Sequence, residues 1–340
     1  MQQLGIKEVV AGRPCAASWL LQGVSAALSA MLALPCLAGE AAPAYPAKPV
    51  SVIIPFTPGS SQETEGRVHM GRLSEQLKQP FVIDFKPGGS TTIGLAFLAR
   101  SAPDGYTLLL ASGSLSLVPL RQIALPFDPL TAFAPVSLLS KRWSSILMHP
   151  SVPGTVKELF AWARANPGKL NFATNGPGSQ SHLTGAWMAD AGNVDITFVH
   201  YKSSAQIFPD LLSGRVHLTT ITLTTGLPFM KTGKAKLLGM ANLSRNPAFP
   251  DMPTIAEQGI RDFEYSSWQG VIAPAKTPPA IVNLLSAELA KVVKAPEVVK
   301  RLEQETQLIG STPGEFAKHI AGETARWSDL IKRGGIVLEE

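Results

Sequence analysis

Short apolar runs alternate along the chain with longer segments in which apolar residues recur at helical spacing. Residues 50–54, 81–85 and 107–111 are predicted strands, because each is a short, mainly apolar run that is followed by a turn containing glycine, proline or serine. A helix is predicted over 63–78, where apolar residues return every three or four positions. The first part of the chain therefore has the order strand, helix, strand, strand.

The same alternation continues through the second half of the chain. Predicted helices cover 156–166 and 205–212 and a third begins at Ser181, and predicted strands cover 170–173, 196–201, 216–221 and 237–241. A strand pair near 265–273 precedes helices at the C-terminus. Strands alternating with helices predict an α/β fold with largely parallel sheets. A chain of 340 residues suits two domains of about 150 residues each, so we expect two lobes with a ligand cleft between them.

Turns rich in glycine, serine and proline follow several of the predicted strands and stand where the next helix begins. Examples are residues 55–59, 87–89, 112–114 and 175–178. Helix N-termini present unpaired N–H groups and the positive end of the helix dipole, and ligands of open α/β sheets bind at this edge. The turns are therefore candidate binding positions.

The first forty residues have the order of a secretory signal peptide. Lys7 and Arg13 precede an apolar run over 24–34, and small residues follow around Ala38. The run is too short to span a bilayer, and no later stretch is apolar for about 18 residues. We predict that residues 1–41 are a signal peptide and that the protein is exported to the periplasm.

Both cysteines, Cys15 and Cys36, fall inside the predicted signal peptide, so the exported chain would have no thiol or disulfide. Its removal leaves the formal net charge of +5 unchanged, because the segment carries two basic and two acidic residues. The basic residues are scattered, which favours solubility over binding to nucleic acid or a membrane surface. The histidines lack the spacing of metal ligands, and we predict no metal site and no cofactor.

A series of short stretches, spread in order over nearly the whole chain after residue 44, carries a family resemblance. They are 45–49, Pro55-Phe-Thr-Pro-Gly59, 87–89, 92–94, Ala102-Pro-Asp-Gly-Tyr-Thr-Leu-Leu109, 125–128, 133–136, 167–171, 181–183, 201–202, 210–214, 249–254 and 273–275. With these stretches the chain resembles the Bug-type extracytoplasmic solute receptors of tripartite tricarboxylate transporters. Each fragment is weak by itself, and the ordered set is specific.

The resemblance implies a two-lobed periplasmic binding protein fold, type-II-like, with a hinge and an inter-lobe ligand cleft. In the family, strand-end turns hold the ligand carboxylate through backbone amides, hydroxyls and ordered waters. The matching positions in the first lobe are Thr57, Gly59, Ser60, Ser61, Gln62, Ser112 and Ser114. Those in the second lobe are Ser179, His182, Lys202, Ser203, Ser204, Ala205 and Thr222.

The sequence departs from the family pattern close to these positions. Ser60 stands where a second glycine is usual, Glu63 replaces an aspartate, and Ser203 replaces a glycine. His217 stands at an acidic position, and Ile221 with Thr222 replaces an Asp-Asn pair. An apolar Ile221 would favour a ring or an alkyl tail, and His217 would disfavour a cationic amine. We therefore expect a ligand that is less highly charged, or differently shaped, than the family name suggests.

Several residues have a structural interpretation beside the functional one. Ser179 and His182 could pair as nucleophile and base, but a hydrolase also needs an orienting group and an oxyanion hole, and Gly-x-Ser-x-Gly is absent. A helix N-terminus with His182 packed behind it is favoured. Ser60 is expected to cap a helix. Trp268 fits a cleft wall or the core equally well, and Lys202 fits a solvated surface lysine as well as a ligand contact.

We expect lobe one to comprise 45–145 with 268–340, and lobe two to comprise 146–267, joined by two crossing segments. Closure over a small carboxylate would exclude water and strengthen each polar contact. The resemblance implies a monomeric receptor, not an enzyme, that delivers its ligand to a small and a large integral membrane permease subunit. A periplasmic ligand sensor for a signalling partner would use the same lobes and stays open, as does a hydrolase-like enzyme.

Overall fold

The strands of the computed structural model form two separate sheets, and the structure describes residues 45–121, 123–202, 204–336 and 338. The first sheet has six strands in the order β11-β4-β10-β3-β1-β2. Their bounds are β1 Val50–Ile54, β2 Phe81–Phe85, β3 Thr107–Ser112, β4 Phe133–Arg142, β10 Trp268–Pro274 and β11 Thr306–Leu308. The second sheet has five strands in the order β7-β6-β8-β5-β9. Their bounds are β5 Ser144–Met148, β6 Asn171–Thr174, β7 Thr197–His200, β8 Leu218–Thr222 and β9 Lys236–Met240.

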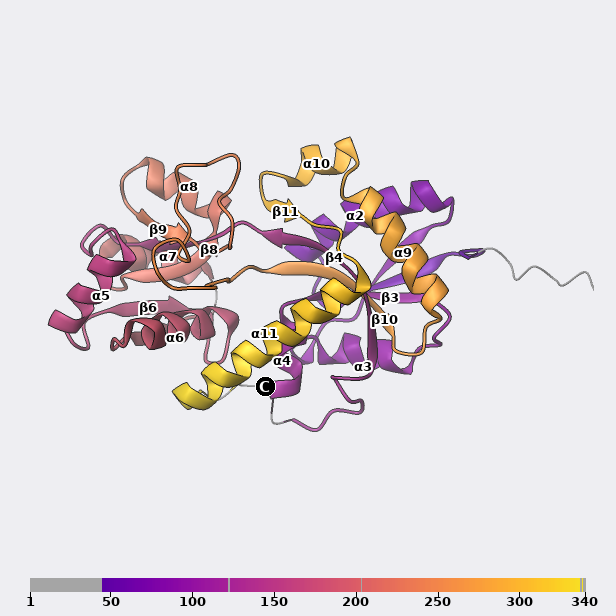
Figure 1. Cartoon of the computed structure of the whole chain (residues 1–340), viewed down its shortest axis with the longest axis horizontal. Helices are drawn as coiled ribbons and strands as arrows, with labels where there is room; N and C mark the ends of the chain where they lie inside the picture. Colours follow the sequence, from indigo (N-terminus) through magenta and orange to yellow (C-terminus); the bar gives the residue numbers. More distant parts are fainter. Residues whose placement is uncertain (1–44, 122, 203, 337, 339–340) are drawn as a thin grey trace, which may run out of the picture. The chain divides into compact units, whose positions relative to one another are not determined.

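Helices lie on both faces of each sheet (Figure 1). The first sheet and its helices are called the first lobe, and the second sheet with α5 to α8 the second lobe. The helices are α2 Ser61–Leu77, α3 Thr92–Arg100, α4 Ser114–Leu117, α5 Val156–Ala165, α6 Gln180–Gly192, α7 Ser204–Ser213, α8 Leu223–Lys231, α9 Pro279–Val292, α10 Pro296–Leu302 and α11 Pro313–Gly334. Two 3-10 turns, η1 Gly89–Thr91 and η2 Val118–Leu120, flank α3 and α4.

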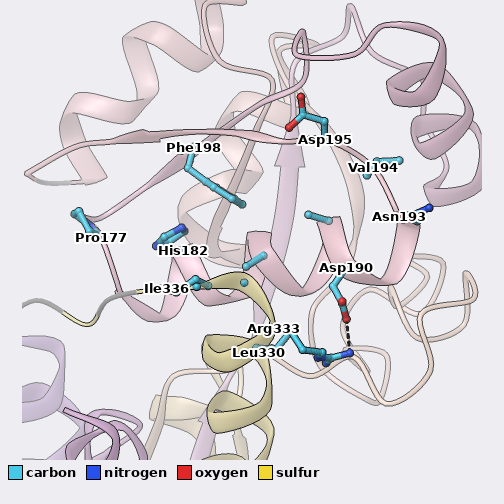
Figure 2. A pocket seen from close by; sticks show the side chains of 14 residues that line it. Pro177, His182, Asp190, Asn193, Val194, Asp195, Phe198, Leu330, Arg333 and Ile336 are labelled. Carbon is cyan, nitrogen blue, oxygen red and sulfur yellow. Dashed lines mark ion pairs between the residues drawn. The ribbon is translucent and has the colours of Figure 1, made fainter. Parts of the chain in front are cut away.

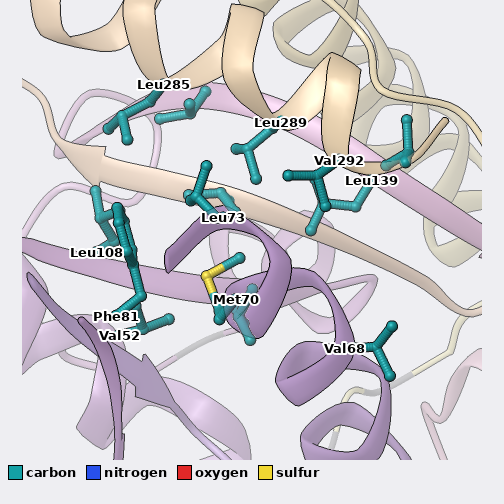
Figure 3. Packing of buried hydrophobic residues seen from close by; sticks show 14 of the residues in the cluster. Val52, Val68, Met70, Leu73, Phe81, Leu108, Leu139, Leu285, Leu289 and Val292 are labelled. Carbon is teal, nitrogen blue, oxygen red and sulfur yellow. The ribbon is translucent and has the colours of Figure 1, made fainter. Parts of the chain in front are cut away.

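The central strands are apolar on both faces because both faces are covered. In β1, Val52 packs with α2 and α9, whereas Ile53 faces α3 and α4. Figure 3 shows Leu73 of α2 and Leu289 of α9 meeting over the strands of the first sheet. Uninterrupted apolar runs are the pattern that such doubly covered strands require. The sequence located both the central strand β1 and the edge strand β2 with their observed bounds.

The prediction of largely parallel sheets is wrong. β1 pairs in parallel with β2 and β3, and β6 pairs in parallel with β7 and β8. All pairs that involve β4, β5, β9, β10 or β11 are antiparallel. The predicted strand pair near 265–273 is also wrong, because one strand, β10, occupies this stretch and pairs with β3 and β4, which are far away in sequence.

β4 is a central strand that the local sequence pattern did not reveal. β4 includes Pro135, Ser137, Ser140 and Lys141, which interrupt any apolar run. The hydroxyl of Ser137 is buried, and it donates to the Ser311 carbonyl oxygen at 2.8 Å, a partner 174 residues away. A polar residue in a central strand is acceptable only with such a partner, and the partner is visible only in the tertiary structure.

Two segments connect the sheets. The first lies between Arg142, the last residue of β4, and Ser144, the first of β5, and the second precedes β10 at Trp268. The predicted lobe boundary at 145/146 falls inside β5, and the boundary at 267/268 falls at the start of β10. α11, yellow in Figure 1, packs against β4 and α4 and also against α6 of the second lobe. The predicted signal peptide lies outside the described residues.

Candidate functional site

The turn after β1, residues 57–62, is closed by its own side chains and begins α2. Ser60 caps the helix, because its Oγ accepts a hydrogen bond from the Glu63 N–H at 3.3 Å. Glu63 reaches back, and its Oε2 accepts from the Gly59 N–H at 2.7 Å. This bond, together with Arg67, holds the pKa of Glu63 below its usual range. The turn therefore already binds and stabilises one carboxylate, that of Glu63.

Gln62 lies beneath this turn and does not face solvent. Its side chain is 6% exposed, and its Oε1 and main-chain oxygen accept from Gln269 Nε2 at 2.9 and 2.8 Å. The Oε1 of Gln269 lies 3.3 Å from His69 Nδ1, and burial lowers the pKa of His69 to about 4. Thr57 and Ser61 are exposed. Gln62, one of the predicted ligand residues, is therefore a buried residue that supports the turn.

The turn after β3 brings three hydroxyl groups together. Ser112 Oγ lies 2.8 Å from Ser114 Oγ, which lies 3.3 Å from Thr91 Oγ1. Thr91 has a φ of 83°, a left-handed conformation that β-branched residues rarely adopt. The sequence indicated Ser112 and Ser114 but not Thr91, because 23 residues separate Thr91 from Ser114 and no local signal predicts its conformation.

The helix that follows this turn, α4, is held by a buried glutamate of α11. Ser116 Oγ and Trp268 Nε1 both donate to Glu323 Oε2, at 2.7 and 2.9 Å. Burial raises the pKa of Glu323. The Thr324 hydroxyl adds a bond to the Ser116 carbonyl oxygen at 3.1 Å. Trp268 is 1% exposed and belongs to the core, so the cleft-wall alternative for this residue is wrong.

In the second lobe, the turn before α6 is also closed by its own groups. Ser179 Oγ accepts from the His182 N–H at 3.3 Å and donates to the Gly176 carbonyl oxygen at 2.7 Å. His182 Nδ1 accepts from the Gly178 N–H at 3.0 Å. Burial and the nearby His200 lower the pKa of His182 to about 4, so the ring is neutral at pH 7. Ser179 is a helix cap with His182 packed behind it, and the two side chains are not arranged as nucleophile and base.

The turn after β7 is more open. Lys202 and Ala205 are exposed, and the Lys202 N–H donates to Gln206 Oε1 at 3.2 Å. Ser204 is the first residue of α7. The prediction for Ser203 falls outside the described residues.

The turn after β8 places the polar and apolar residues differently from the sequence hypothesis. Thr222 Oγ1 lies 2.8 Å from Thr225 Oγ1, at the start of α8. The Ile221 side chain instead packs in the apolar cluster beneath α7 and α8, beside Gly226. Ile221 is therefore a packing residue, and the argument that it favours a ring or an alkyl tail is wrong.

His217 lies at the opposite end of β8 from Thr222. The two residues are five positions apart along an extended strand, about 16 Å, and His217 Nδ1 accepts from the Asn171 N–H at 3.1 Å. Its ring packs against Trp162, and burial, with His149 nearby, lowers its pKa. Because a strand is extended, its two ends are far apart, and a residue at its start cannot reach the turns at its end. The proposed ligand role of His217 is wrong.

The strand-end turns of the two lobes meet at Gly113 and Gln180. A Cβ atom on Gly113 would lie 2.1 Å from Gln180 Nε2, so a larger residue here would displace the end of the Gln180 side chain. The Gln180 Nε2 is buried without a hydrogen-bond partner. Leu117 of α4 and Leu183 of α6 pack together one turn further on. Gln180 lies inside the predicted ligand segment 179–182, of which Ser179 and His182 were the named contacts.

A cavity of about 730 Å³ lies beside these turns, between α6, β7 and the end of α11 (Figure 2). Its walls include His182, Phe198 and Ile336, and Arg333 Nη1 pairs with Asp190 Oδ2 at 2.9 Å across its edge. Asp195 also lines the cavity, which contains no residue of the two first-lobe turns. The hydroxyl groups and helix N-termini are concentrated in the strand-end turns rather than in this cavity.

Within the residues that the structure describes, no three His, Asp or Glu side chains are grouped as metal ligands. A search of the same residues for a helix long and apolar enough to cross a membrane also finds none.

The profile of the tripartite tricarboxylate transporter family receptors matches residues 66–336. The chain belongs to this receptor family. It is 33% identical over 314 residues to protein BugT of Bordetella pertussis, covering 89% of this chain and 95% of BugT. A Rhodopseudomonas palustris protein solved with adipate is 32% identical with a TM-score of 0.69, covering 86% of this chain and 99% of that one. MatC of Rhodopseudomonas palustris, solved with malate, is 27% identical with a TM-score of 0.64, covering 84% and 100%.

Membership explains the architecture described above. This is a Bug-type receptor with the two-lobed fold of periplasmic solute-binding proteins, and the family consists of receptors rather than enzymes. Receptors of this family bind small carboxylates and work with membrane transporter components. The resemblance inferred from the ordered sequence stretches is confirmed.

Proposed function

We propose that this receptor captures a small dicarboxylate between the strand-end turns of its two lobes and releases it to a transporter. The observation that carries the proposal is the meeting of Gly113 and Gln180, where the start of α4 in the first lobe abuts the start of α6 in the second. Helix N-termini from both lobes thus point toward one region. The 13-residue α6 supplies N–H groups and a positive dipole end, and the turn before the four-residue α4 supplies N–H and hydroxyl donors, so the two carboxylate groups of a ligand would both be matched.

The ligand contacts proposed in the first lobe are the exposed Thr57 and Ser61 and the hydroxyl cluster of Ser112 and Ser114. Gly59 and Ser60 shape the turn around the Glu63 carboxylate. In the second lobe the proposed contacts are Gln180, the start of α6 at Ser179, Lys202, residues 203–205 and Thr222. Lys202 is exposed and adds one charge to a site otherwise made of neutral donors.

The related structures support a dicarboxylate as the ligand class. One was solved with adipate and the other with malate, at 32% and 27% identity to this chain. Because the arguments from Ile221 and His217 no longer apply, nothing in the second lobe favours an aromatic or alkyl monocarboxylate over a dicarboxylate.

The receptor is proposed to act as a periplasmic monomer that meets a small and a large integral permease subunit. Export would use residues 1–41 as a signal peptide. The two lobes would be 45–145 with 268–340 and 146–267, and the crossing segments at Trp143 and before Trp268 would form the hinge.

The test is a thermal-shift and calorimetric screen with adipate, malate, citrate, aspartate and benzoate. A ligand at 100 times its Kd stabilises the folded state by about 2.7 kcal/mol, which corresponds to a rise in Tm of about 5 °C for a chain of this size. We expect that rise with adipate or malate and a one-to-one binding ratio. Adipamide, the uncharged diamide of adipate, is the matched control and should have no effect. An equal response to adipamide, or none to any acid, would refute carboxylate capture.

A further inference from the structure

Arg142 connects two parts of the protein. Its backbone belongs to a crossing segment, and its side chain contacts the turn after β1, residues 57–62. It is the last residue of β4, and β5 of the second lobe begins two residues later. Its N–H donates to the Ser267 carbonyl oxygen in the other crossing segment at 2.7 Å. Its carbonyl oxygen accepts from Asn242 Nδ2 at 3.0 Å, and Asn242 Oδ1 accepts from the Ser144 N–H at 2.9 Å. Arg142 is thus fixed to both crossings.

The side chain of Arg142 turns back into the first lobe. Its Nη2 donates to the Ser61 carbonyl oxygen at 3.3 Å and lies 3.2 Å from Glu65 Oε2. Ser61 is the first residue of α2 and belongs to the turn proposed to bind ligand. Glu65 stands one turn further along α2. One guanidinium therefore holds two successive turns of the helix that follows β1.

The pair is almost completely removed from water. The side chain of Arg142 is 11% exposed and that of Glu65 is 3% exposed. Glu65 is bound on its other oxygen by the Ser140 hydroxyl, which also belongs to β4. A third partner of Arg142, Glu305, lies 3.1 Å from Nη1 but is 54% exposed. Nη2 thus serves the Ser61 carbonyl oxygen and the Glu65 carboxylate while Nη1 reaches Glu305, and the planar, forked guanidinium of arginine supports this spread of donors, which the single ammonium group of lysine does not reproduce.

We propose that Arg142 and Glu65 are a positioning pair that couples the first-lobe ligand turn to the hinge, so that ligand capture and lobe closure occur together. A change of backbone direction at the crossing moves the guanidinium, and the guanidinium moves the start of α2. Conversely, a ligand that fixes the turn fixes Arg142 and favours one arrangement of the crossing segments. This inference rests on the proposed function, because it assigns the coupling of that same site.

Closure can be followed with spin labels at two exposed positions, Lys157→Cys in the second lobe and Lys276→Cys in the first. Cys15→Ser and Cys36→Ser in the full chain leave only the introduced thiols for labelling. The probes are adipate and malate. The parent chain should shift to a shorter, narrower distance distribution with at least one probe. Absence of binding and closure in the parent would refute the proposed function, and the coupling with it.

The decisive variant is the double change Glu65→Leu with Arg142→Met. Removing Arg142 alone would leave a buried carboxylate without its partner, whereas replacing both members by apolar residues often preserves stability. We expect the double variant to regain the parent Tm in the absence of ligand. Its affinity should still fall at least fivefold, within the range typical of coupled sites, and its closed population at saturation should be incomplete.

Two further variants distinguish coupling between the turn and the hinge from a role of Arg142 in packing alone. Arg142→Lys keeps the charge but loses the fork, so it should reproduce the affinity loss of the double variant in part, even if the latter folds poorly. Glu305→Gln is the matched control, because it removes an exposed partner of the same guanidinium, and it should behave as the parent. Parent-like affinity in Arg142→Lys and the double variant would overturn the proposal. Reduced affinity with complete closure would overturn it as well, since Arg142 would then shape the turn without coupling it.

Discussion

The strand-end turns of the two lobes use similar residues but are supported differently. Beneath the first-lobe turns lie buried polar side chains that connect distant parts of the chain, such as Gln62 with Gln269 and Ser116 with Glu323. In the second lobe, Ser179 bonds to Gly176 three residues away, and Thr222 pairs with Thr225. The first lobe thus offers a fixed surface, whereas the second offers short local loops. We infer that the first lobe sets the position of the ligand and the second adapts to it.

The largest expected effect tests the buried support of the first lobe. Glu323→Ala leaves Ser116 Oγ and Trp268 Nε1 without their acceptor in a buried site, at about 1–3 kcal/mol for each unsatisfied group. We expect the free energy of unfolding to fall by about 2–4 kcal/mol, measured by urea denaturation. Thr222→Ala, the second-lobe counterpart, should cost less than about 1 kcal/mol because its hydroxyl pair is exposed. Similar losses for both variants would remove the distinction between the lobes.

The second prediction concerns acid, and it rests on His69 in the same buried support. Its pKa is lowered from 6.5 to about 4 by burial, so between these values the unfolded chain binds more protons than the folded one. Stability is therefore lost as pH falls below 6.5, by about 2 kcal/mol from this group at pH 5. His69→Gln, which keeps a donor for Gln269, should show a correspondingly shallower loss of urea stability between pH 7 and pH 5. An unchanged slope would mean that His69 is protonated in the folded protein.

The smallest expected effects are changes in the affinity for adipate, measured by calorimetry, when single contacts in either lobe are altered. Ser114→Pro removes an N–H at the start of α4 and disfavours the helical conformation of Gly113, whose φ is −54°. Ser60→Pro removes the N–H that donates to the Thr57 carbonyl oxygen. Each should weaken binding by more than tenfold, about 1.4 kcal/mol.

Lys202→Ala, in the second lobe, is the comparison for these two variants. It should weaken binding by about 1–2 kcal/mol, less than either proline variant does, because one exposed ammonium contributes one charge-assisted hydrogen bond. Complete loss of binding with Lys202→Ala, and none with either proline, would place the ligand anion in the second lobe.

The local sequence pattern predicted correctly those features that depend only on neighbouring residues. The bounds of β1 and β2 and the cap at Ser60 follow from apolar runs and from a hydroxyl placed before a helix, so they could be predicted. The central strand β4 was missed because its serines and Lys141 have partners more than 70 residues away. Polar residues are acceptable inside a sheet when they have hydrogen-bond partners from distant parts of the chain. The local sequence pattern does not reveal these partners.

The candidate site divides in the same way. The strand-end turns were found because a polar turn between a strand and a helix is a local feature. The assignments to His217 and Ile221 failed because they needed to know which end, and which face, of β8 meets the other lobe. Strand geometry gives two faces and two ends, and only packing against α5, α7 and α8 selects among them.

The sequence alone determined the α/β alternation, the order of family-like stretches and the turns that begin α2, α4 and α6. These are properties of neighbouring residues, for which backbone propensity and apolar periodicity are sufficient. Only the tertiary structure decided the mixed direction of the sheets, the approach of Gly113 to Gln180, and the burial of Arg142 with Glu65. The antiparallel strand pairs and the two side-chain contacts each join residues more than 65 positions apart, and such pairs are chosen by the packing of the whole chain.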